Sequence, residues 1–146
     1  MSHRRTILSF CLLIATVAIL TMNQIAHSVP ATADAKQRVF EIRTYTTEPG
    51  KLPDLLKRFR EHTTKLFEKH GMTNIGYWVP TDEPLSKNTL IYVLAHDSRD
   101  AAKKSWDGFR DDPDWIKVRD ASEAPGKIVN KIESIFANPA DFSAIK

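Results

Sequence analysis

Cysteine is almost absent from this sequence of 146 residues: the only one, Cys11, lies inside an apolar run near the N-terminus. The rest of the chain therefore offers no disulfide, no thiolate nucleophile and no cysteine-ligated zinc, haem or iron–sulfur site. Glycine is scarce, with five residues, and no phosphate-binding glycine loop, Ser-His-Asp pattern or paired-histidine metal motif occurs. We therefore expect a domain held together by packing alone, with no metal and no cofactor.

One long apolar run is present, at the N-terminus. Arg4 and Arg5 precede the apolar residues 7–22, and a polar stretch of small residues follows up to Ala35. This order is typical of a secretory signal peptide, and cleavage is expected after Ala35. An uncleaved anchor is the alternative, but the run is shorter than the roughly 20 residues that span a bilayer. We predict a signal peptide over 1–35 and a periplasmic or secreted domain over 36–146, without a stable membrane anchor.

The predicted mature chain carries little net charge. The sequence has 21 basic and 18 acidic residues, and segment 1–35 takes away two basic and one acidic, which leaves +2 before histidine is counted. Such near-neutrality lacks the electrostatic footprint of a nucleic-acid-binding protein, so no nucleic-acid partner is expected. The remaining 111 residues suffice for one domain with a modest core.

Hydrophobic periodicity predicts alternating strands and helices. Alternating apolar residues, or short apolar runs bounded by turn signals, indicate strands at 38–46, 72–79, 89–96 and 128–136. Amphipathic stripes indicate helices at 53–70 and 98–110, and a short helix at 113–121. The order βαββαβ is that of the ferredoxin-like α+β fold, in which four antiparallel strands carry the helices on one face.

The strand expected at 89–96 is apolar on both faces, so the open face of the sheet needs a cover. In a chain this short, a second copy is the expected cover. We predict a homodimer in which two sheets close face to face into a dimeric α+β barrel.

Several motifs taken together resemble the NIPSNAP family. They include Glu41-x-Arg43-Thr44-Tyr45, Pro49-Gly50-Lys51 at a helix start, and Asp112-Pro113-x-Trp115, and the similarity runs from about 39 to 143. The resemblance implies a dimeric ferredoxin-like barrel, related in architecture to cofactor-free monooxygenases and haem-handling enzymes. It implies no reaction, because the family as a whole has no established enzymatic activity.

Charged residues on the first and last strands form the main candidate site. Alternation places Glu41, Arg43 and Tyr45 on one face of the first strand, while Glu133 lies on the last strand. Because this fold sets these strands side by side, we expect Arg43 to meet Glu133 inside the barrel. Arg43 then either anchors a ligand carboxylate or enolate or forms a structural ion pair. The ion pair is the favoured interpretation.

Histidine and tryptophan supply the remaining candidates. His62 is a candidate proton carrier beside Tyr45, although a half-buried helix position is the simpler interpretation. His70 is predicted to end its helix, and His96 is a weak candidate for a haem or metal ligand. Trp78 could stack on a flat ligand, but we expect the tryptophans mainly to pack the helices onto the sheet.

Three functions remain open at this point. The leading one is an exported domain of unassigned activity, whose dimer encloses a cavity for a small hydrophobic or aromatic molecule. The second is a cofactor-independent monooxygenase-like or isomerase-like enzyme acting on a small aromatic or enolisable substrate, with Arg43 holding the anion and His62 or Tyr45 moving a proton. The third is a structural or protein-interaction module.

Overall fold

The computed structural model describes residues 38–146, so the predicted signal peptide lies outside the described residues. A single antiparallel sheet has the order β2-β3-β1-β4. Its strands are β1 (Val39–Thr47), β2 (Thr73–Trp78), β3 (Thr89–His96) and β4 (Val129–Ala137). The predicted strands and the ferredoxin-like α+β fold are confirmed, with strand ends shifted by one residue.

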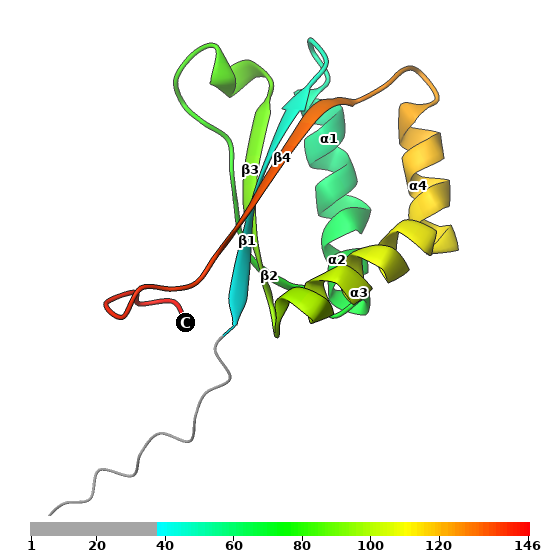
Figure 1. Ribbon diagram of the computed structural model, residues 1–146. Coiled ribbons are helices and arrows are strands. Elements are labelled where there is room, and N and C mark those ends of the chain that lie inside the picture. The colour runs from blue at the N-terminus through cyan, green and yellow to red at the C-terminus, as the bar shows by residue number, and fades with distance from the viewer. Residues whose placement is uncertain (1–37) are drawn as a thin grey trace, which may run out of the picture. The chain divides into compact units, whose positions relative to one another are not determined.

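Helices lie on one face of this sheet (Figure 1). The first predicted helix is continuous but has three parts, α1 (Leu52–Arg58), the π-helix η1 (Phe59–Thr63) and α2 (Thr64–Lys69). In the π segment the backbone N–H of Thr64 donates to the carbonyl of Phe59, five residues earlier. The Thr63 hydroxyl also donates to the Arg58 carbonyl, at 3.2 Å. The sequence did not predict this widened turn.

Side chains cap the N-termini of the remaining two α-helices. Helix α3 (Arg99–Asp111) starts after Ser98, whose hydroxyl accepts from the Ala101 N–H at 3.0 Å. Asp112 ends α3 and caps α4 (Pro113–Glu123), where its carboxylate accepts from the Asp114 N–H at 2.9 Å. A short 3-10 turn, η2 (Leu85–Lys87), lies in the loop between β2 and β3.

The core lies between the helices and the covered face of the sheet. Leu90, Tyr92 and Leu94 of β3 are fully buried there. Tyr92 is at the centre of a ring cluster, with its ring centroid 5.2 Å from those of Tyr45 and Phe59. Such edge-on contacts add about 0.5–1.5 kcal/mol each beyond the area that they bury.

The opposite face of the sheet carries apolar side chains without a covering layer. Strand pairing aligns Ile42 with Val93 and with Ile135, so all three share this open face. Trp78 and Ile135 expose 52% and 62% of their surface. Among residues 38–146, no helix is long and apolar enough to cross a membrane.

The structure assigns the two faces of β1 differently from the expectation. Glu41, Arg43 and Tyr45 were expected inside a barrel between two sheets, whereas they lie on the helix-covered face, with Glu41 in contact with Trp106 of α3. The apolar face of β1 is the open one. Helix side chains supply hydrogen-bond partners for the polar residues, and this allows the polar face to be buried.

Candidate functional site

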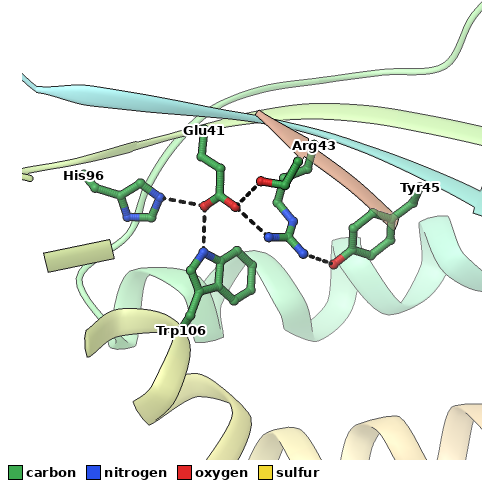
Figure 2. A network of polar contacts seen from close by, with 6 residues as sticks. Glu41, Arg43, Tyr45, His96 and Trp106 are labelled. Atoms are coloured by element: carbon green, nitrogen blue, oxygen red, sulfur yellow. Dashed lines mark hydrogen bonds and ion pairs between the residues drawn. The ribbon is translucent and has the colours of Figure 1, made fainter. Parts of the chain in front are cut away.

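A buried carboxylate organises the covered face of the sheet (Figure 2). Glu41 is 1% exposed, and each of its two carboxylate oxygens accepts two hydrogen bonds. Trp106 Nε1 donates to Oε2 at 2.6 Å, and His96 Nε2 lies 3.1 Å from the same oxygen. Arg43 Nη1 and the Ser134 hydroxyl each lie 2.6 Å from Oε1. These residues together with Tyr45 are called the Glu41 network.

The Glu41 network keeps its central carboxylate ionised. Burial alone would raise the pKa of Glu41, but hydrogen bonds from His96, Ser134 and Trp106 and the charge of Arg43 lower it to about 2. Glu41 is therefore a fixed negative charge at neutral pH, with its acceptor positions already occupied. That state suits a structural anion better than a proton acceptor.

Arg43 is held inside the protein through both of its Nη atoms, while its Nε is buried without a hydrogen-bond partner. Its guanidinium carbon lies 4.1 Å from the centroid of the Trp106 ring, a cation–π contact, and Nη2 donates to the Tyr45 hydroxyl at 3.4 Å. Burial alone would lower the pKa of Arg43, but Tyr92, Tyr45 and Glu41 hold it above its ordinary value. Arg43 thus stays charged and fixes the Tyr45 hydroxyl in place.

The expected pair between Arg43 and Glu133 does not form. In the β1–β4 ladder Arg43 is opposite Ser134, and Glu133 is opposite Thr44. A difference of one position reverses the face of the sheet, so Glu133 lies on the open face, where its carboxylate accepts from Lys131 at 2.8 Å. The register between strands was not readable from either strand alone.

A cavity adjoins the network on the helix side. It has a volume of about 160 Å³ and lies between η1, α3, α4 and the sheet. Most of its wall is apolar, made by Tyr45, Phe59, Phe67, Phe109, Trp115, Val129 and Ile132. Arg58, Arg119 and Glu123 contribute its charged side chains. We call it the inner cavity. Tyr45 is the member of the Glu41 network that lines it.

A second, larger hollow lies between α1, η1 and α4. It has a volume of about 660 Å³ and is lined mainly by charged and polar side chains, among them His62 and Lys117. We call it the outer groove. Arg58 lines both hollows.

The structure separates the predicted site residues into three places. Glu41, Arg43 and Tyr45 lie together in the Glu41 network. His62 has a side chain that is 48% exposed, 3.8 Å from Glu61, and lines the outer groove, so it does not join Arg43 and Tyr45. Trp78 and Glu133 lie on the open face of the sheet.

Three members of the network were not selected from the sequence. His96 was a weak candidate ligand, Trp106 was expected to pack a helix onto the sheet, and Ser134 was not a site candidate. His96 was the detectable one, because alternation puts it on the same face of β3 as Leu94, the residue opposite Glu41. Its Nδ1 is buried without a hydrogen-bond partner.

The structure also tests the predictions for two tryptophans and for His70. Trp106 is 8% exposed in the core, and Trp115 packs on Phe109 with centroids 4.5 Å apart, which confirms packing for these two. His70 ends α2 as predicted, and its Nε2 lies 2.6 Å from an oxygen of Asp112. Within residues 38–146, no group of three or more acidic, histidine or cysteine side chains is arranged to hold a metal ion.

A four-stranded antiparallel sheet with helices on one face defines the class of ferredoxin-like α+β domains. Within that class the chain belongs to the NIPSNAP family, whose model matches residues 40–144. No functionally curated protein matches the chain.

Solved structures agree with this fold. A NIPSNAP family protein of unknown function from Agrobacterium tumefaciens is 22% identical, with a TM-score of 0.66 over 77% of this chain and 96% of that one. A NIPSNAP domain protein from Burkholderia xenovorans is 23% identical, with a TM-score of 0.60 over 72% and 97%. A Streptomyces coelicolor monooxygenase, solved in complex with nanaomycin D, is 12% identical, with a TM-score of 0.53 over 76% and 95%. At these identities the similarity concerns the fold alone.

Proposed function

We propose that this protein is an exported, homodimeric NIPSNAP domain that binds a small aromatic molecule in the inner cavity. The observation that carries the proposal is the cavity itself: about 160 Å³ of space bounded mainly by five aromatic rings and two aliphatic side chains. An apolar cavity of about 150 Å³ is large enough to bind benzene. The inner cavity therefore suits a molecule with one aromatic ring.

The wall of the cavity favours a ring that carries a polar group. Phe59, Phe109 and Trp115 offer faces and edges for offset or edge-on contact with a bound ring. Tyr45 also lines the cavity, and its hydroxyl, which accepts from Arg43, is the polar group that we propose for a ligand to meet. Most pockets for small molecules combine an apolar lining with a few placed polar groups in this manner.

Binding of phenol to the purified domain tests the proposal. Trp115 lines the cavity, so ligand entry should change tryptophan fluorescence, and calorimetry should give the affinity. Val129→Phe places a ring where the ligand would lie and should weaken phenol binding about tenfold or more. Ile116→Phe, on the exposed side of α4, is the matched control and should leave it unchanged. Equal phenol affinity in both variants would refute the inner cavity as the binding site.

Dimer formation is proposed from the open face of the sheet. Trp78 and Ile135 are more than half exposed there, beside the partly buried Ile42 and Val93. Large exposed apolar patches are unusual on monomeric proteins and mark interaction sites. A second copy presents the same patch, which satisfies the two-fold symmetry of most homodimers. Native mass spectrometry of the purified domain should report a dimer, together with any retained small molecule.

Export is proposed from the N-terminal segment alone. The basic start, apolar run and small-residue end of residues 1–35 support it. Mass spectrometry of the protein recovered outside the cytoplasm should give an N-terminus at Lys36. Recovery of the intact chain in the cytoplasmic fraction would contradict export.

A second candidate function is catalysis of proton transfer on a small aromatic or enolisable molecule. The specific observation in its favour is Tyr45, which lines the inner cavity and whose hydroxyl accepts a hydrogen bond from the charged Arg43. His62 lines the outer groove, so Tyr45 is the candidate proton carrier. Deuterium exchange into an enolisable aromatic ketone, faster with the wild type than with Tyr45→Phe, would support an enzyme. Equal exchange rates for the wild type and Tyr45→Phe would contradict catalysis by Tyr45, and ligand binding alone would stand.

A further inference from the structure

Arg58 is a buried cation that faces both hollows of the domain. It is the last residue of α1, it is 5% exposed, and it lines the inner cavity as well as the outer groove. Its carbonyl accepts from the Thr63 hydroxyl across the π segment, at 3.2 Å. π-Helical turns are rare and frequently occur at functional sites. The widened turn therefore directly follows the residue that lines both hollows.

The guanidinium of Arg58 is only partly satisfied by the protein. Nη1 donates to the Ser122 hydroxyl at 3.1 Å and to Oε1 of Glu123 at 3.0 Å. Nε is buried and has no hydrogen-bond partner. A buried donor without a partner is unfavourable, so an acceptor that a ligand brings to Nε would be favoured.

Glu123 is the more exposed partner of this ion pair. Its side chain is 30% exposed, whereas that of Arg58 is 4% exposed. Glu123 is also the last residue of α4, directly before a turn that contains Gly126 at a φ of +135°. Movement of the Glu123 carboxylate into solvent would leave the buried guanidinium without its counter-charge, and a ligand carboxylate in the same place would offset that loss.

Charge at the inner cavity selects the sign of a ligand. Two cations, Arg58 and Arg119, and one anion, Glu123, line it, which leaves one positive charge in excess. The charges of the outer groove cancel, since three acidic and three basic residues line it besides His62. The excess favours a monoanion in the cavity, and a planar guanidinium matches the two oxygens of a carboxylate with two parallel hydrogen bonds.

We propose that the inner cavity binds small aromatic carboxylates, with the ring among the aromatic side chains and the carboxylate on Arg58 in place of Glu123. This inference rests on the proposed function and names the class of its ligand. Glu123 occupies the carboxylate position when no ligand is bound. The outer groove gives the ligand a route to Arg58, because the same side chain lines both hollows.

Benzoate and phenol form the probe pair, since both carry one ring and only benzoate is charged at neutral pH. Calorimetry at constant ionic strength should give tighter binding of benzoate than of phenol to the wild-type domain. Arg58→Gln should weaken benzoate binding about tenfold or more while changing phenol binding little. Lys103→Gln is the matched control: it removes the same charge from an exposed position of α3 that lines neither hollow, and both affinities should stay unchanged.

Glu123→Gln gives an independent test if Arg58→Gln fails to fold. Removing the competing charge should strengthen benzoate binding about threefold and leave phenol unaffected. Equal benzoate affinity in the wild type and Glu123→Gln, or benzoate no tighter than phenol, would overturn the carboxylate inference while the aromatic-binding function stands. If neither probe binds the wild type, the aromatic-binding function fails and the carboxylate inference fails with it.

Discussion

Glu41 makes the stability of this domain depend on pH in a way that can be calculated. Its pKa falls from an ordinary 4.5 to about 2 in the folded protein. Each tenfold change in acidity corresponds to about 1.4 kcal/mol, so the ionised form contributes about 3 kcal/mol at neutral pH. The folded-state pKa is the depressed one, so this contribution is present above pH 4.5 and is lost as the pH falls towards 2. About 2 kcal/mol should be gone by pH 3.

Glu41→Gln isolates that contribution. The amide keeps the shape of the side chain but loses the charge, and it turns one acceptor oxygen into a donor that faces groups which are themselves donors. Breaking a buried ion pair costs about 3–5 kcal/mol, because Arg43 is left without its counter-charge. We expect Glu41→Gln to lower the free energy of unfolding by that amount at pH 7. The stability of the variant should also change much less than that of the wild type between pH 5 and 3.

Urea unfolding followed by tryptophan fluorescence, at several pH values from 7 to 3, measures the effect. The difference in the free energy of unfolding between wild type and variant should shrink by about 2 kcal/mol over that range. Other carboxylates titrate in both proteins and cancel in the difference. Glu83→Gln, an exposed carboxylate in the loop between β2 and β3, should change stability by less than about 0.5 kcal/mol. A difference between wild type and Glu41→Gln that does not vary with pH would refute the assignment of Glu41 as a stabilised anion.

Three further changes test separate parts of the structure. Asp112→Ala removes the cap of α4 and the partner of His70, and should lower the melting temperature by about 5 °C, as calorimetry would show. Ile135→Glu puts a charge on the open face and should convert the proposed dimer into a folded monomer in native mass spectrometry; a persistent dimer would exclude this face. Tyr45→Phe keeps the ring but removes the hydroxyl, and should weaken phenol binding about fivefold with a change in stability of about 1 kcal/mol.

Most of the fold was predictable from the sequence because its signals are local. Ser98, Pro113 and Gly71 mark helix ends through the hydroxyl cap, the fixed φ of proline and the left-handed turn, which Gly71 adopts at a φ of +76°. Hydrophobic alternation and turn signals predicted the ends of each strand to within one residue. The π segment at Phe59–Thr63 was missed, since it depends on a backbone bond pattern that hydrophobic periodicity does not report.

The candidate site was predictable only in part. Glu41, Arg43 and Tyr45 were selected correctly as one cluster, because they share a face of one strand. His62 and Glu133 were grouped with that cluster wrongly, since their positions depend on helix rotation and on strand register rather than on spacing along the chain.

By itself, the sequence determined the family, the order of the elements and the alternation that places three polar residues on one side of β1. The tertiary structure alone decided which side of the sheet the helices cover, and therefore that this polar side is the buried one. It also decided that Trp106, His96 and Ser134, from three other elements, supply hydrogen bonds to Glu41. The physical reason is that local propensities act over a few residues, whereas the partners of a buried charge come from segments up to 93 positions apart in the chain.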